Sequence, residues 1–201
     1  MRHTPHFLMT DPAEVARLVR GNPWATYVSS TEHGLVASHY PTLVDEDAEG
    51  LTILSHFGRP DEQLHELGQH EVLVIVQGPH EYVSSSWYDQ GDDVPTWNHV
   101  TAHLYGVPEI LTAEENFAVL AHLTDHFEGG FPHGRSLSLD EERSRRIAKG
   151  TVGLRMRVTR FDARAKLSQN KSPEVAERII DELEHRNPGL AEEMRRVRDA
   201  G

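Results

Sequence analysis

Histidine stands out among the residues that could do chemistry in this sequence. It accounts for 14 of the 201 residues, whereas cysteine is absent. Imidazole titrates near neutral pH and can bind a metal or the iron of haem. The lack of cysteine excludes disulfides, thiolate metal ligands and cysteine nucleophiles. A histidine ligand to haem iron is therefore one chemistry that the composition leaves open.

Four groups of polar and aromatic residues lie near the ends of expected strands, where the mouth of a small barrel would gather them. Arg59 follows a strand and a glycine, which suits a phosphate contact but also an ordinary turn. The third group is rich in Ser, Trp and Tyr, which suits a flat conjugated ligand and equally a subunit interface. The fourth contains two cations, two amides and two hydroxyls, and could be a solvated helix cap. In chain order they are Ser38 to Pro41, Ser55 to Arg59, Gln77 to His80 with Ser84 to Tyr88 and Pro95 to Asn98, and Lys166 to Ser172.

The sequence lacks the common motifs of nucleotide, zinc and hydrolase sites. It contains no Gly-x-Gly-x-x-Gly turn, no phosphate loop, no His-Glu-x-x-His and no Gly-x-Ser-x-Gly. The two helices expected after residue 172 do not form an evident helix-turn-helix. The common nucleotide, zinc and hydrolase functions therefore have no support in the sequence.

The net charge of −12 bears on the partners. Such a surface repels nucleic-acid phosphate, so direct DNA binding is not favoured. No apolar stretch is long enough for a membrane span, and no signal peptide precedes the first helix. We therefore expect a cytoplasmic protein without a membrane partner.

Hydrophobic periodicity predicts the elements that position these groups. Period-two segments at 24–29 and 35–40 indicate a hairpin, and further strands are expected at 51–56, 72–77, 100–111 and 152–158. The run at 72–77 is typical of a strand buried on both faces. Gly78-Pro79 breaks it, and 80–84 is the candidate segment for its resumption. Helices are expected from Thr10-Asp11-Pro12 to Gly21 and at 61–67, 113–127 and 140–149. This order predicts an α+β, mainly β protein: an antiparallel barrel of about six strands with peripheral helices.

The chain divides into two parts by composition. Residues 1–171 hold the expected strands and the four polar groups, and form the predicted split-barrel cofactor-binding domain. Residues 172–201 are strongly charged and helical, with a break at Asn187-Pro188-Gly189. We expect this C-terminal tail to pack on the barrel or extend from it.

Several collinear motifs resemble the PaiB family, usually described as FMN-binding negative transcriptional regulators. The motifs are Asn22 to Thr26, Ala37 to His39, Val76 to Ser84, Ser86 to Tyr88, Val94 to Asn98 and Lys166 to Lys171. The resemblance implies a split β-barrel related to flavin-reductase and pyridoxamine-phosphate-oxidase barrels, and a homodimer with FMN at its interface. It further implies a regulatory or redox-sensing module, with a flavin oxidoreductase as a neighbouring alternative. The sequence alone does not decide whether the protein is an enzyme.

The resemblance and the strand-end positions together give the expected site. Arg59 and Lys166 are expected to neutralise a phosphate or haem propionates. The residues expected to line the flat ring system are Ser55, His56, Gln77 and Trp97, and those completing the cofactor site are Ser168, Gln169 and Asn170. A small-molecule substrate pocket is expected from Ser38, His39, Trp87 and Tyr88. Because so many aromatics should not stay exposed, the loop from Ser84 to Asn98 is expected near the dimer interface.

One departure from the family pattern opens an alternative cofactor. Relatives commonly carry Asn-Pro and then a Trp after the strand that ends at Ser55-His56, whereas this chain has Arg59-Pro60 and His65. Some relatives on this framework resemble haem-dependent enzymes, notably piperazate synthases that form a nitrogen–nitrogen bond. In that reading haem b replaces FMN, with His65 as the axial ligand. Helical spacing around Leu64 and Leu67 favours the simpler expectation that His65 faces solvent.

Overall fold

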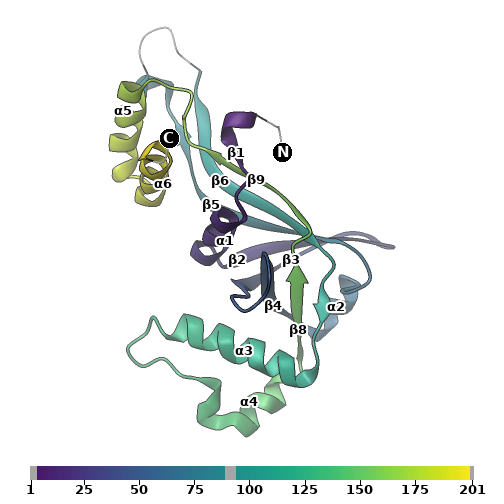
Figure 1. The fold of residues 1–201 in the computed structure, drawn as a ribbon. Coiled ribbons are helices and arrows are strands. Elements are labelled where there is room, and N and C mark those ends of the chain that lie inside the picture. Colours follow the sequence, from purple (N-terminus) through teal and green to yellow (C-terminus); the bar gives the residue numbers. More distant parts are fainter. Residues whose placement is uncertain (1–3, 89–93, 200–201) are drawn as a thin grey trace. The chain divides into compact units, whose positions relative to one another are not determined.

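The structure is a computed structural model that describes residues 4–88 and 94–199 (Figure 1). Within these residues the chain forms six α-helices and a nine-stranded sheet of order β1-β9-β6-β5-β2-β3-β4-β8-β7. The strands are β1 (Leu8–Met9), β2 (Trp24–Thr31), β3 (Gly34–Val44), β4 (Thr52–Gly58), β5 (Val72–Val83), β6 (Thr96–Gly106), β7 (Glu109–Ile110), β8 (Thr151–Arg157) and β9 (Arg160–Lys166). The helices are α1 (Pro12–Gly21), α2 (Arg59–Leu64), α3 (Ala113–Glu128), α4 (Glu141–Ala148), α5 (Pro173–Glu184) and α6 (Pro188–Asp199). This confirms the predicted antiparallel, mainly β fold with peripheral helices.

The chain clusters into two compact units, each described separately below. Unit 1 consists of Met1–Leu18, Gln77–Ala102 and Asp162–Gly201, and unit 2 of Val19–Val76 and His103–Phe161. Strands β5, β6 and β9 each contribute residues to both units. Residues 172–201, expected as a separate helical tail, form α5 and α6 in unit 1.

The predicted hairpin is confirmed, and it forms the middle of unit 2. Trp24 pairs with Pro41 and Thr31 with Gly34, in antiparallel register. Alternation along β2 buries Ala25, Tyr27 and Ser29 on one face. An apolar cluster packs α3 against this part of the sheet. It consists of Leu43, Leu54, Leu111, Val119 and Leu123. Helix α3 begins at the capping box that Thr112 and Glu115 form.

Strand β5 differs from its prediction in length and in burial. It continues to Val83 without the break that Gly78-Pro79 indicated, and so includes most of the segment 80–84 expected to resume it. Gly78 is required because a Cβ would lie 2.7 Å from Leu18 Cδ1 and 3.2 Å from the Val100 carbonyl oxygen. The prediction that this strand is buried on both faces is wrong. Val72, Val74 and Val76 are buried, whereas Leu73 and Ile75 on the other face are only half-buried.

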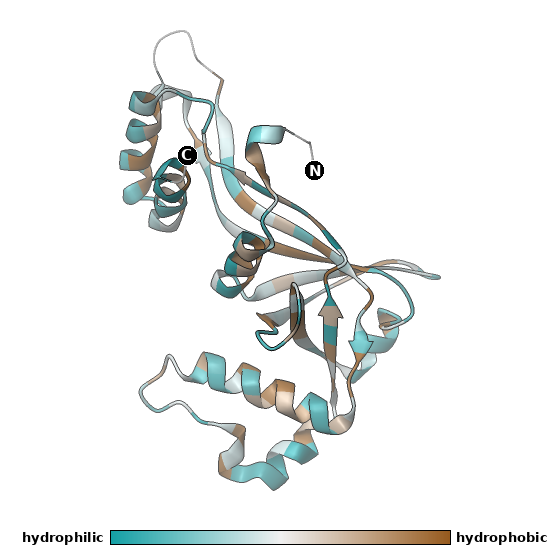
Figure 2. Ribbon diagram, viewed as in Figure 1, coloured by the Kyte–Doolittle hydropathy of each residue, from teal (hydrophilic) through white to brown (hydrophobic). Residues whose placement is uncertain are grey.

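Unit 1 is held together by its C-terminal helices. Helix α5 buries Val175, Ile179, Ile180 and Leu183, and α6 packs against it. Figure 2 shows the mixed hydropathy of α5, in contrast to α4, where hydrophilic residues dominate. No helix in the described parts of the chain is long and apolar enough to cross a membrane.

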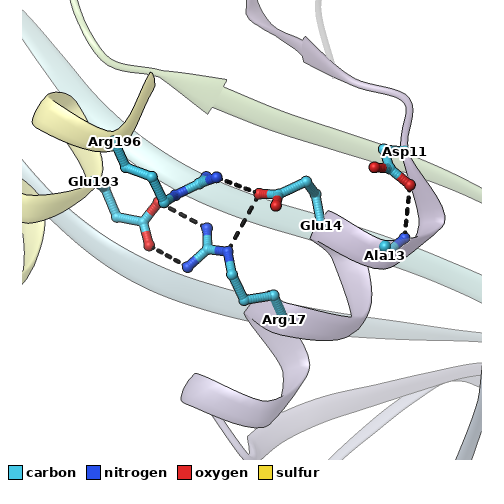
Figure 3. A network of polar contacts seen from close by, with 6 residues as sticks. All are labelled: Asp11, Ala13, Glu14, Arg17, Glu193 and Arg196. Atoms are coloured by element: carbon cyan, nitrogen blue, oxygen red, sulfur yellow. Dashed lines mark hydrogen bonds and ion pairs between the residues drawn. The ribbon is translucent and has the colours of Figure 1, made fainter. Parts of the chain in front are cut away.

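Four charged side chains connect α6 to α1 within unit 1 (Figure 3). Arg17 donates to both carboxylate oxygens of Glu193, at 2.6 and 2.8 Å. Arg196 lies 2.6 Å from Glu14 and 3.1 Å from Glu193. Burial alone would raise the pKa of Glu193, but hydrogen bonds and charge from Arg17 and Arg196 lower it below its ordinary value. The C-terminal helix is therefore fixed by a paired network.

Candidate functional site

A pocket of about 220 Å³ lies in unit 1, next to the motif at 166–171. Its lining includes Lys166 and Lys171. The Lys166 ammonium contacts only neutral oxygens among the described residues, so this part of the pocket suits an anion. The lining residues are Tyr88, Val94, Pro95, Thr96, Asn98, Lys166, Ser168, Asn170 and Lys171.

The two lysines are held in place by different contacts. The Lys166 ammonium donates to the carbonyl of Trp97 at 3.0 Å and to the hydroxyl of Thr96. Burial lowers the pKa of Lys166, because a desolvated ammonium is costly without an anionic partner. The Lys171 ammonium lies 4.5 Å above the ring of Tyr88. Tyr88, which was predicted to line a substrate pocket, is buried.

Ser168 combines backbone strain with burial at this site. Its φ of +63° lies in the left-handed region, which side chains with a Cβ rarely adopt. Its hydroxyl exchanges hydrogen bonds with the Asn98 amide, at 2.9 and 3.1 Å, and both residues are buried. Strained buried residues of this kind are found more often at ligand sites than elsewhere.

Trp97 gives unit 1 a flat, accessible aromatic surface. It is 54% exposed, although it lies within β6 and not in the loop expected from the sequence. Its ring lies 6.3 Å from that of His80 and 6.0 Å from that of Tyr82. The Gln77 amide lies 3.3 Å from His80 Nδ1, so Gln77 and Trp97 both contact His80. The structure thus brings two of the predicted ring-lining residues together.

Three of the predicted cofactor residues, Ser55, His56 and Arg59, belong to unit 2. Ser55 is fully buried and donates to the carbonyl of Pro41 at 2.7 Å, so its hydroxyl is already engaged. His56 is half-buried, its Nδ1 has no hydrogen-bond partner among the described residues, and burial lowers its pKa. Arg59 lines a pocket of about 290 Å³ and donates to the carbonyl of Lys149 at 2.9 Å.

His65 lies in the interior and not on the solvent-facing side expected from helical spacing. It is fully buried just after α2. Its Nδ1 lies 2.8 Å from the Ser29 hydroxyl and its Nε2 lies 3.0 Å from the Ser38 hydroxyl. Burial lowers the pKa of His65, which favours neutral imidazole. A bond to iron would have to replace one of these two hydrogen bonds.

The residues of the predicted substrate pocket divide between the units. Ser38 and His39 are consecutive in β3 and therefore point to opposite faces. Ser38 contacts His65, whereas His39 lies 3.0 Å from the Thr26 hydroxyl. Trp87 and Tyr88 belong to unit 1.

The expected contribution of the 84–98 loop to a dimer interface includes residues 89–93, which lie outside the described residues.

Gln169 and Asn170, the remaining predicted cofactor residues, make different contacts in unit 1. Gln169 bonds the backbone of Ala165 and Leu167, and Asn170 is exposed at the pocket.

Sequence reasoning missed Arg164, which lies in β9 two residues before Lys166. Its side chain is only 6% exposed, and neither Nε nor Nη2 has a hydrogen-bond partner among the described residues. The available signal was the Arg-x-Lys alternation, which places both cations on one face of a strand. It was overlooked because β9 itself was not predicted.

Comparison with known proteins places these features in a family. The sequence matches the family described as "Putative FMN-binding domain" over residues 1–160. The chain is also 30% identical over 195 residues to the Bacillus subtilis protein "Protease synthase and sporulation protein PAI 2". That alignment covers 94% of this chain and 92% of the relative.

Solved structures of low sequence identity share the fold. The FAD and haem binding protein from Mycobacterium smegmatis matches with a TM-score of 0.62 and 17% identity, over 84% of this chain and 78% of that one. The flavocytochrome Anf3 from Azotobacter vinelandii matches with a TM-score of 0.61 and 12% identity, over 82% and 72%. These likenesses confirm the predicted split-barrel fold.

Proposed function

This chain belongs to the PaiB-type family of FMN-binding domains, and from that premise we propose that it binds FMN as a regulatory or redox-sensing protein. The observation that carries the proposal is Lys166, whose ammonium lines the unit 1 pocket and contacts only neutral oxygens among the described residues. A phosphate monoester requires such a cationic site, and charge-assisted contacts are the strongest polar contacts available to it.

The residues present fit the two ends of FMN. The pocket of about 220 Å³ is smaller than the roughly 300–1,000 Å³ of sites that enclose a whole ligand, so it suits the phosphate end. Trp97 offers an exposed aromatic surface for the ring system. Bound FMN would supply a redox centre, whereas the protein's own residues bind and orient it.

The regulatory part of the proposal does not require this chain to bind DNA by itself. A net charge of −12 opposes contact with phosphate backbones outside a local cationic patch. We propose a homodimer, supported by an apolar face of unit 2 where Val28 pairs with Leu73 and Thr26 with Ile75. All four side chains are half-buried in the single chain.

The test is titration of the purified protein with FMN, followed by flavin fluorescence. Lys166→Ala should weaken binding roughly 10- to 150-fold, because a charge-assisted hydrogen bond contributes about 1.5–3 kcal/mol. Arg59→Ala tests the other predicted phosphate cation in the same way. Arg143→Ala, which removes an exposed arginine in α4, is the control. No FMN binding by the wild-type protein would exclude the proposed function.

The second candidate function is that of a haem-dependent enzyme. The unpartnered imidazole nitrogen of His56 favours it. The buried Nδ1 of His56 has no hydrogen-bond partner among the described residues, whereas both nitrogens of His65 are engaged. Reconstitution with haem of the wild type, His56→Ala and His65→Ala separates these ligands. Loss of the Soret band in only one variant identifies the histidine, and no Soret band in the wild type excludes this candidate.

A further inference from the structure

Arg164 is a buried cation of unit 1 that lacks hydrogen-bond partners for two of its nitrogens among the described residues. It is 6% exposed, and its Nε and Nη2 atoms have no hydrogen-bond partner in the described parts of the chain. A buried guanidinium without a partner costs several kcal/mol, so proteins rarely retain one unless an anion reaches it.

The two unpartnered atoms form one edge of the guanidinium. Arg20 shows what that edge does elsewhere in this protein: its Nε and Nη2 hold the two carboxylate oxygens of Glu46 at 2.7 and 2.8 Å. Parallel donors of this kind match two oxygens of a carboxylate or a phosphate. The geometry at Arg164 is therefore suited to two-point binding of an oxyanion.

The neighbours of Arg164 add positive charge. Lys166 lies two residues along β9 and thus on the same face. His99 of β6 is close enough that, together with its burial, the charges of Lys166, Arg164 and His80 lower its pKa. No salt bridge joins Arg164 or Lys166 to a carboxylate among the described residues. Two fixed positive charges on one face match a dianion better than a single carboxylate.

We propose that Arg164, together with Lys166, binds the phosphate monoester of the cofactor, Arg164 through its Nε and Nη2 edge. This inference rests on the proposed binding of FMN and adds the residue that gives the site its preference for a phosphorylated flavin. Lys166 connects this face to the pocket, because it also lines that pocket.

The first experiment compares FMN with riboflavin, which lacks the phosphate. The wild-type protein should bind FMN more tightly than riboflavin. Arg164→Met should weaken FMN binding roughly 10- to 150-fold and leave riboflavin affinity unchanged. Arg160→Met, which removes an exposed arginine from the same strand, should leave both affinities unchanged.

The second experiment needs no flavin. At matched ionic strength, inorganic phosphate should raise the Tm of the wild type by roughly 2–4 °C and leave that of Arg164→Met unchanged. Without phosphate, Arg164→Met should unfold at a higher temperature than the wild type, because it lacks the uncompensated charge. Arg164→Lys keeps the charge but lacks the two-point edge, and should show a reduced phosphate effect.

The outcomes separate the two proposals. If FMN binds but Arg164→Met binds it as tightly as the wild type, the role of Arg164 is wrong and FMN binding stands. If phosphate protects only the wild type but no flavin binds, FMN binding is wrong and the anion site stands without its cofactor. If phosphate protects neither protein and both Arg164 variants lower the Tm, the guanidinium is structural and the inference is overturned. A change from dimer to monomer in Arg164→Met without any phosphate effect would also overturn it, in favour of a carboxylate from a second copy.

Discussion

Among the residues that the structure describes, two other than glycine adopt the left-handed backbone conformation. Ser168 does so at the pocket of unit 1, with a φ of +63°, and Glu66 does so directly after His65, with a φ of +48°. At Glu66 this conformation ends helix α2. The Leu67 N–H donates to the backbone carbonyl of Glu62, and the Glu66 N–H donates to that of Gln63. Helix α2 therefore ends next to His65, whose side chain is buried.

The strain at Glu66 predicts a difference between two small replacements. Both Glu66→Gly and Glu66→Ala remove the carboxylate, which lies 3.4 Å from His70, so that loss cancels in the comparison. Only glycine adopts positive φ without steric cost, so the glycine variant should be more stable by about 1 kcal/mol. Urea unfolding measures the difference. An alanine variant as stable as the glycine variant would contradict strain at this position.

Three partly or fully buried histidines predict how stability depends on pH. Burial is the main cause that lowers the pKa values of His56, His65 and His99 from the ordinary 6.5. Below pH 6.5 the unfolded chain therefore binds more protons than the folded one, so stability falls as the pH falls. Urea unfolding between about pH 7.5 and 5.5 should show this decline, and His65→Gln should reduce its slope. His133→Gln, in an exposed loop, serves as the control. An unchanged slope in His65→Gln would exclude its contribution.

The side-chain types gave a useful but incomplete description of the site. Lys166, Ser168 and Asn170 were predicted from their motif, and the structure places them around one pocket. Ser55 was also predicted, but it is buried with its hydroxyl bonded to Pro41. Position at a strand end does not reveal which face a residue occupies, because a shift of one residue reverses it.

At the scale of elements, local sequence patterns predicted those helices and strands whose formation depends on neighbouring residues. The hairpin of segments 24–29 and 35–40 and the helix at 113–127 were predicted from the sequence, and both form as expected. Strand β9 was missed because its buried positions hold Ala163 and Ala165, between polar residues, and so lack an apolar alternation. Strand β5 continues past Gly78 because Leu18 and Val100 require the absence of a Cβ there, a long-range fact that the sequence does not show.

The network between α1 and α6 predicts how the C-terminal helix is retained. Glu193→Gln keeps the shape but removes the charge that pairs with Arg17 and Arg196. We expect a loss of about 1–3 kcal/mol in the free energy of unfolding, and faster amide exchange in α6. Glu192→Gln, one residue away and exposed, is the matched control. Equal exchange in the two variants would show that apolar packing alone retains α6.

At the scale of the whole molecule, the proposed homodimer makes the final prediction. The outer face of β2 and β5 presents Thr26, Val28, Leu73 and Ile75, all half-buried in the single chain. A second copy would cover this apolar face, and each copy would then bury the other's side chains. Ile75→Glu would place one unpaired carboxylate per subunit in the interface, at a cost of several kcal/mol.

That cost should weaken dimerisation by about 100-fold or more, which sedimentation velocity at micromolar concentration would detect as a shift to monomer. Leu139→Glu adds the same charge at a residue that is 73% exposed, and it should leave the dimer intact. A monomeric wild-type protein would contradict the homodimer. A dimer of unchanged affinity in Ile75→Glu would instead place the interface elsewhere, with the 84–98 loop as the next region to test by the same substitution strategy.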